Sequence, residues 1–238
     1  MNKIKGFALG FVPRYMGNGL VIVVYDMLSK IYKVSKETIA DHAEKNRTLL
    51  NSKTSFFVPG RFIEKQAQWE VVLFGKKTAI KQSGCGALAS YNALVALGEK
   101  PDVDTLVELI RCLETKGVVM GGMFGVSPLA IRRYFTGRNF IVREYKGKSK
   151  EKMEHLGAAS DAIIVIAFNS RNDLSAGAHY ICITKKEDGT YAAHNTYCYD
   201  GAKGCYCERN GFSSVSEAIE NMNQTSPKAI WLMGITKA

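Results

Sequence analysis

Hydrophobic residues in the first part of the chain recur at the spacing of amphipathic helices. Residues 19–33 and 36–49 show this period, and Ser35 stands where the second helix needs an N-cap. The segment from 85 to about 97 is apolar on all sides, which predicts a helix buried inside the protein. Further helices are predicted at 102–115 and from the Ser127-Pro128 pair to about 135.

The later part of the chain changes to the pattern of β-strands. Apolar runs predict strands at 69–74, 140–145, 162–168, 178–185, 191–196 and 229–235, with a short helix near 214–222. Helices first and strands afterwards are typical of an α+β fold, here an antiparallel sheet packed against the buried helix at 85–97. We expect residues 1–70 to form a helical extension and residues 71–238 to form the main domain.

Composition indicates a globular protein and changes this picture little. Apolar residues make up 46% of the chain and charged residues 23%, and the net charge is +10. The basic residues are scattered, and no basic run interleaved with aromatic residues marks a nucleic-acid groove, so no nucleic-acid partner is expected. The charge is explained either by a solvated basic surface or by an acidic partner.

The apolar runs and the cysteines bear on location. The apolar run at 7–12 ends at Pro13 and Arg14 without a small-residue cleavage site, so a secreted protein is not expected. No run approaches the roughly 18 residues of a membrane span. Six cysteines in a chain of 238 residues are no disulfide framework, and a nucleophilic thiol must stay reduced. We therefore expect a cytoplasmic protein.

A cysteine stands at the start of the buried helix, in Gln82-Ser83-Gly84-Cys85-Gly86. A thiol there faces free backbone N–H groups and the positive end of the helix dipole, so its pKa is predicted to be lowered. His179 follows in an apolar run, and Asn195 follows an Asp188-Gly189 turn. Cysteine, histidine and asparagine in this order are the arrangement of a papain-like cysteine hydrolase.

Several stretches carry a resemblance to one family: Cys85-Gly86, Gly125-Val126-Ser127-Pro128, Gly177-Ala178-His179-Tyr180-Ile181-Cys182-Ile183 and residues 191–195. With them, residues 76–238 resemble papain-like cysteine peptidases, and more narrowly the bacterial group that includes the bacteriocin-leader (double-glycine) peptidases. The resemblance implies a papain-like fold and a stand-alone bacterial cytoplasmic peptidase that acts on a peptide or protein substrate without a cofactor.

The same resemblance assigns roles. Cys85 would be the nucleophile, His179 the general base and acid, and Asn195 the group that orients the imidazole. The alternatives are an inert buried thiol for Cys85 and a satisfied core histidine for His179.

The pairing of the strands that carry His179 and Asn195 decides which residue is the third member of the catalytic triad. A three- or five-residue loop centred on Glu187 would place Asn195 directly opposite His179. A two-residue Asp188-Gly189 turn would pair position 179 with position 198, so that His194 would share the face of His179 and Asn195 would point away. The resemblance favours Asn195, and a bulge would reconcile Asn195 with the tight turn. The sequence leaves both registers open.

The oxyanion hole departs from the family pattern. In the superfamily a glutamine usually stands six residues before the nucleophile, but position 79 is alanine here. Gln82 is the nearby substitute, and its amide would donate to the developing oxyanion together with the Cys85 N–H. A solvated loop glutamine is the alternative.

Several other features of the sequence have simple explanations. His194, Cys198, Cys205 and Cys207 lie close in sequence, but Cys-x-Cys is tighter than usual ligand spacing, so no metal is expected. A Cys198–Cys205 cross-link and ordinary loop thiols are the other interpretations. Gly121-Gly122 is interpreted as a flexible loop rather than a self-cleavage site.

The extension at 1–70 has three interpretations: helices packed on the main domain, an inhibitory pro-segment, or a peripheral membrane contact. The last would use Lys3, Lys5, Arg14, Lys30 and Lys33 beside apolar surface.

The predicted function is a thiol hydrolase that cleaves a peptide or isopeptide amide through an acyl-enzyme. A papain-fold deamidase or acyltransferase would use the same residues, and a catalytically silent binding module would use the same scaffold. We expect cleavage after a small residue, glycine above all, in an acidic or neutral peptide. The sequence indicates no oligomeric state.

Overall fold

The protein is a mixed α+β structure built on one antiparallel sheet. The computed structural model describes residues 18–52, 57–172, 176–197 and 206–238. The sheet has six strands in the order β3-β8-β4-β5-β6-β7, and every neighbouring pair is antiparallel. The strands are β3 (Ile141–Tyr145), β4 (Ala162–Phe168), β5 (Ala178–Lys185), β6 (Tyr191–Tyr197), β7 (Tyr206–Phe212) and β8 (Lys228–Thr236). This confirms the predicted fold class at the level of an α+β fold with an antiparallel sheet.

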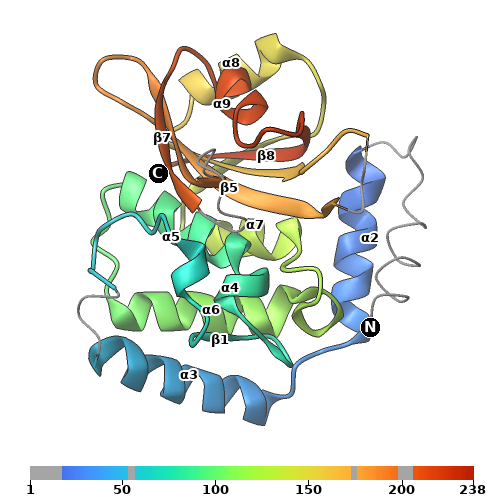
Figure 1. The fold of residues 1–238 in the computed structure, drawn as a ribbon, viewed down its shortest axis with the longest axis vertical. Coiled ribbons are helices and arrows are strands. Elements are labelled where there is room, and N and C mark those ends of the chain that lie inside the picture. Colours follow the sequence, from blue (N-terminus) through green and yellow to red (C-terminus); the bar gives the residue numbers. More distant parts are fainter. Residues whose placement is uncertain (1–17, 53–56, 173–175, 198–205) are drawn as a thin grey trace.

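Helices cover both faces of this sheet (Figure 1). One face packs against α5 (Cys85–Ala96) and α7 (Pro128–Thr136), and α6 (Val103–Gly117) packs behind these two helices. The other face packs against α8 (Lys150–Ala158) and α9 (Val215–Glu220). Because both faces are covered, β4 is buried along its whole length, and its apolar side chains alternate between the two cores.

Helix α5 lies in the middle of the larger core, against β5. Every residue from Cys85 to Leu94 is buried, which follows from a sequence with apolar residues on all sides. The short helix α4 (Ile80–Ser83) ends directly before it. The predicted buried helix is therefore present, and its first residue is the cysteine.

The N-terminal residues share this core. Helix α2 (Asn18–Ile31) packs beside α7, and α3 (Lys36–Ser52) packs on the outside of α6 (Figure 1). Ile22 and Leu50 belong to the same buried cluster as α5. Ser35 caps α3 as predicted, accepting the Thr38 N–H at 3.1 Å. The hydrophobic packing is thus continuous across the predicted boundary at residue 70.

A buried hydrogen bond between His42 and Glu114 joins α3 to α6. His42 Nδ1 lies 2.8 Å from Glu114 Oε1, which also accepts the Gly75 N–H at 2.7 Å. Burial raises the pKa of Glu114, and its hydrogen bonds to His42 and Gly75 oppose this effect. The contact places the extension firmly against the main domain.

Some predicted elements differ from the structure. The strand predicted at 69–74 is wrong: a 3₁₀ turn η1 (Gln66–Gln68) precedes it, and only β1 (Leu73–Phe74) pairs, with β2 (Thr78–Ala79). The carbonyls of Trp69 and Val72 instead accept N–H groups at the start of α4, at 3.1 and 2.9 Å. Tertiary packing of the two apolar side chains therefore overrides their strand propensity. The sequence pattern also missed α4, α8, β7 and the 3₁₀ segment η2 (Val119–Gly122).

Helix α2 exposes an apolar stripe. Leu20, Val23, Met27 and Ile31 are each at least half exposed, and the neighbouring Lys30 pairs with Asp26 at 2.9 Å. None of the described helices combines the length and the apolar character that crossing a membrane requires. Lys3, Lys5 and Arg14, which the proposed membrane contact also invokes, lie outside the described residues.

Candidate active site

Two glycines allow α4 and α5 to meet at Cys85. A Cβ at Gly84 would lie 2.4 Å from Ile80 Cδ1, and a Cβ at Gly86 would lie 2.4 Å from Val126 Cγ1. Any larger residue at either position would push the helices or the Val126 loop away. The Gly-Cys-Gly sequence therefore sets the thiol at a close junction of two helices, at the first residue of α5.

Cys85 lines a cleft of about 290 Å³ between α5 and the sheet. Gln82 lies on the same wall, and Phe124 and Gly125 come from the loop before α7. Ala178 and Tyr180 come from β5 and Tyr197 comes from β6. The thiol is 8% exposed, so it is reached only from inside this cleft.

The thiol is protonated at neutral pH. Burial raises the pKa of Cys85, and hydrogen bonds from the backbone N–H groups of Tyr180, Gly86 and Cys85 itself oppose the rise without cancelling it. The predicted lowering of this pKa is wrong in direction, because desolvation of the thiolate outweighs the favourable contacts at the helix terminus.

His179, the second residue of β5, is buried and neutral. Its ring Nε2 lies 2.7 Å from the backbone oxygen of Asn195. Burial lowers the pKa of His179 to about 4, and the Asn195 carbonyl partly opposes this. A carbonyl oxygen can only accept, so Nε2 carries the proton and Nδ1 keeps its lone pair. This is the tautomer that a general base requires.

The thiol and the imidazole each bond backbone groups near the start of β5, and among the described residues no hydrogen bond joins the two side chains. The side chains of Tyr180 and Cys182 belong to the core around α5, and those of Ile181 and Ile183 belong to the core on the other face of the sheet. Because side chains alternate along a strand, the position of His179 is on that other face. Pairing of β5 with β6 begins only at Cys182 and His194, however, and leaves the strand edge free before that point. The His179 ring bonds Asn195 across this edge, and the thiol accepts the N–H of Tyr180 there.

Two tyrosines connect His179 to the cleft. The ring of Tyr197, which lines the cleft, lies 4.9 Å from the His179 ring, and that of Tyr206 lies 5.2 Å from it. Burial raises the pKa of Tyr197, and a charge on Cys85 raises it further. His179 itself is not one of the described residues that line the cleft, although Ala178 and Tyr180 on either side of it are.

Asn195 orients His179 through its backbone rather than its side chain. Its φ is 58°, in the left-handed region that asparagine tolerates better than most residues. Its side chain bonds Gln66 twice: Nδ2 donates to Gln66 Oε1 at 2.9 Å, and Oδ1 accepts the Gln66 N–H at 3.2 Å. The Asn195 N–H donates to Glu64 Oε2 at 2.8 Å. Asn195 lies inside β6, where the pairing with β7 shifts register, and these contacts hold this β-bulge with its carbonyl aimed at the imidazole.

Both predicted registers for β5 and β6 are wrong. Cys182 lies opposite His194 and Lys185 opposite Tyr191, a register between the two predicted ones. The loop has three residues and is centred on Asp188: Lys186 N donates to Thr190 O at 2.8 Å, and Gly189 has a φ of 84°. A turn followed by a left-handed glycine is a favoured three-residue hairpin, which explains the difference.

Gln82 lies in α4, three residues before Cys85. It lines the cleft with Cys85, and its Oε1 accepts the Ala79 N–H at 2.9 Å. The residue is exposed, so its predicted role in the oxyanion hole stays a prediction.

His194 is hydrogen-bonded on both sides of its ring. Nδ1 lies 2.5 Å from Glu64 Oε1, Nε2 lies 3.0 Å from Thr184 Oγ1, and the ring stacks on Phe62 with centroids 3.9 Å apart. Glu64, His194 and Glu208 bring one ligand atom each within 4.8 Å of one another. Because both His194 nitrogens are in use, the arrangement fits a structural histidine better than a metal ligand. Cys198 and Cys205 lie outside the described residues.

Three site residues were not found from the sequence. Glu64 and Gln66 hold Asn195, and Tyr25 of α2 lines the cleft beside Cys85. Burial raises the pKa of Tyr25 to about 12. All three come from the predicted extension, and no local pattern links them to residues more than 50 positions away. The extension therefore contributes directly to the site.

Comparison of the chain with protein-family models, with curated proteins and with solved structures gave no match.

Proposed function

We propose that the protein is a papain-like cysteine hydrolase that cleaves a peptide or isopeptide amide through a thiol acyl-enzyme. The observation that carries the proposal is the pair of groups near the start of β5. Cys85, the first residue of a buried helix, accepts the N–H of Tyr180, and the adjacent His179 has its Nε2 proton tied to Asn195 O. This leaves Nδ1 as the base.

The proposed reaction begins from a neutral thiol and a neutral imidazole. His179 Nδ1 takes the thiol proton as Cys85 Sγ attacks the carbonyl carbon of the scissile amide. The oxyanion accepts hydrogen bonds from the Cys85 N–H and from Gln82 Nε2. The imidazolium then gives its proton to the leaving nitrogen, and water, deprotonated by the same imidazole, releases the acyl group as a carboxylic acid.

The lining of the cleft supports a small residue at the scissile bond. Tyr25, Phe124 and Tyr197 line the cleft together with Cys85, and so do Gly125 and Gly177. We expect the three rings to limit the space for side chains at the scissile bond, so that glycine is accommodated best. Acylation of Cys85 by a glycine-containing peptide is therefore the expected first step.

A peptide library incubated with the full chain tests the proposal. We expect cleavage after glycine, with mass spectrometry of a quenched reaction showing an acyl adduct on Cys85. Cys85→Ala should abolish both signals, whereas Cys112→Ala, which removes a half-buried thiol of α6, should retain them. Release of ammonia without chain cleavage would instead identify a deamidase, and transfer to an added amine an acyltransferase.

A catalytically silent binding module is the second candidate, and the raised pKa of Cys85 favours it. Such a module would bind peptide in the cleft and form no adduct. Peptide binding that is equal for the wild type and Cys85→Ala, with no product after prolonged incubation, would establish it.

A further inference from the structure

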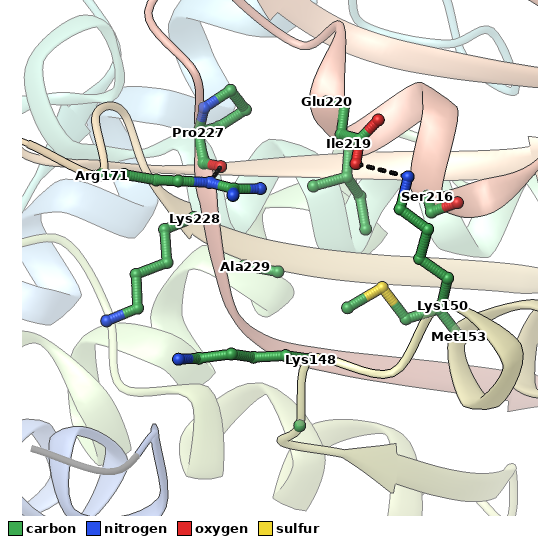
Figure 2. A pocket seen from close by; sticks show the side chains of 11 residues that line it. Lys148, Lys150, Met153, Arg171, Ser216, Ile219, Glu220, Pro227, Lys228 and Ala229 are labelled. Atoms are coloured by element: carbon green, nitrogen blue, oxygen red, sulfur yellow. Dashed lines mark hydrogen bonds and ion pairs between the residues drawn. The ribbon is translucent and has the colours of Figure 1, made fainter.

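A second cleft lies at the end of the sheet, between α8, α9 and the start of β8. Its volume is about 420 Å³, and Met153, Ile219 and Ala229 form an apolar floor. Lys148, Arg171 and Lys228 stand around it. Figure 2 shows these three side chains on one side of the cleft and Lys150 with Glu220 on the other.

Within the described part of the chain, the three cations have no carboxylate partner. Lys150 is neutralised by Glu220 at 2.8 Å, whereas no described carboxylate forms an ion pair with Lys148, Arg171 or Lys228. The Arg171 Nε donates to Pro227 O at 3.1 Å, which fixes the guanidinium and leaves its terminal nitrogens to donate elsewhere. The cleft therefore offers a positioned donor set for an anion.

The cations are close enough to repel one another. Partial burial lowers the pKa of Lys228, and the positive charges of Lys148 and Arg171 lower it further. A bound anion would remove this repulsion, so the arrangement favours anion binding over an empty cleft.

This cleft lies at the same end of the sheet as the Cys85 cleft but on the opposite face, because Met153 and Ile219 belong to the core under α8 and α9 and Cys85 belongs to the core around α5. In β4, Phe168 pairs with Lys228 of β8 on one side and with Ala178 of β5 on the other. Lys228 lines the cationic cleft and Ala178 lines the Cys85 cleft. Two strand spacings, about 10 Å, separate the two backbones, and an extended peptide that reaches both clefts must also pass around the end of β4, which takes more than three or four residues.

We propose that the cationic cleft binds an acidic side chain of an extended peptide whose scissile bond lies at Cys85. The inference rests on the proposed hydrolase function. The Arg171 fork and the two lysines would hold the carboxylate, and the apolar floor would take the methylene stem of glutamate. The cleft would select acidic peptides, consistent with the net charge of +10.

Binding by the full chain with Cys85→Ala tests this directly, since the peptide is then not turned over. The probes are three fluorescein-labelled peptides, each with a Gly-Gly pair. The first carries three glutamates placed four residues before the pair, and the second carries them four residues after it. The third carries glutamines in place of the glutamates. By fluorescence anisotropy we expect one glutamate probe to bind at least tenfold more tightly than the glutamine probe. Lys228→Gln and Lys148→Gln should each remove at least fivefold of this affinity.

Lys152→Gln is the matched control, because it removes the same charge from α8 outside this cleft, and it should change affinity less than twofold. Equal binding of glutamate and glutamine probes, or no loss in Lys228→Gln, would overturn the proposal. Tight binding of inorganic pyrophosphate that leaves peptide binding unchanged would identify a small-anion site and reject the peptide.

The two proposals fail separately. Selective binding of the glutamate probe without cleavage by the wild type would retain the cationic cleft and reject the hydrolase. Cleavage of glutamate and glutamine peptides at equal rates would retain the hydrolase and reject the cleft as a substrate site.

Discussion

The imidazole Nε2 of His179 is hydrogen-bonded to the backbone oxygen of Asn195, at 2.7 Å, while the Asn195 side chain faces Gln66. An orienting group built from a carbonyl depends on the conformation of the chain and less on the side chain that carries it. The carbonyl contact to His179 and the burial of Cys85 lead to specific expectations for substitutions and for pH dependence.

The first prediction concerns two replacements at Asn195. Glycine tolerates the φ of 58° and alanine does not, so Asn195→Gly should keep the carbonyl in place better than Asn195→Ala. Both lose the bonds to Gln66. We expect kcat to fall roughly tenfold for glycine and roughly hundredfold for alanine, as about 1.4 kcal/mol corresponds to each factor of ten. Equal loss in both variants would assign the orienting role to the side-chain amide instead.

The second prediction makes Glu64 a positioning residue. Its carboxylate accepts the Asn195 N–H at 2.8 Å and contacts His194 Nδ1, so Glu64→Ala should release the bulge in β6 that aims the carbonyl. We expect a fall in kcat of about ten- to hundredfold, with stability reduced by about 1–3 kcal/mol. The proton NMR signal of His179 Nε2–H should shift or exchange faster.

Glu208→Ala is the control for Glu64. Glu208 contacts Lys186 at 3.6 Å and makes no bond to Asn195, so its loss should leave the His179 signal in place. An unchanged signal in Glu64→Ala would refute the positioning role.

The third prediction is the pH dependence of labelling. Because burial raises the pKa of Cys85 and lowers that of His179 to about 4, the resting pair is neutral across the physiological range. Alkylation of Cys85 by iodoacetamide should then rise about tenfold per pH unit from pH 6 to 8, following the thiolate fraction. Mass spectrometry of each cysteine gives the rates. A plateau below pH 7 would reveal a thiolate–imidazolium pair.

The fourth prediction is a loss of stability in acid caused by His179. Its pKa is about 4 in the folded protein and 6.5 in the unfolded chain, so the unfolded state binds the proton more readily. The free energy of unfolding that depends on a neutral His179 is fully present above pH 6.5. It is lost as the pH falls toward 4, by up to about 3 kcal/mol. Urea unfolding at several pH values should show this slope. His179→Gln should flatten it, and His155→Gln, which changes an exposed histidine, should not.

The fifth prediction concerns Gln82. Its Oε1 is occupied by the Ala79 N–H, so catalysis would use only the Nε2 donors. Gln82→Ala should lower kcat by about 10²–10³ with little change in KM, which is typical for loss of one oxyanion donor. Gln82→Glu keeps the bond to Ala79 and should lose as much activity, because a carboxylate cannot donate. Full activity in Gln82→Glu would exclude the amide from the oxyanion hole.

Local sequence signals predicted the elements whose neighbours in the chain determine them. The strands β4 and β5 begin and end where the apolar runs predicted, and the Ser35 cap starts its helix as expected. Residues 69–74 differ because Trp69 and Val72 both pack into the core around α5, and their carbonyls accept N–H groups of α4. The predicted registers of β5 and β6 were wrong by one or two positions. Loop length decides the register, and the turn residues alone left the loop length open.

The sequence by itself determined that a cysteine flanked by glycines begins a helix buried on all sides, since apolar periodicity and glycine packing are local properties. Only the tertiary structure decided how the other groups reach it. Asn195 presents its carbonyl to His179 because Glu64 and Gln66, about 130 positions earlier, hold the bulge of β6 in which it lies. Burial, which depends on every element packed around Cys85, raises its pKa against the effect of the helix terminus. Hydrogen bonds between distant segments and desolvation arise from the packed whole, and no pattern within a short window contains them.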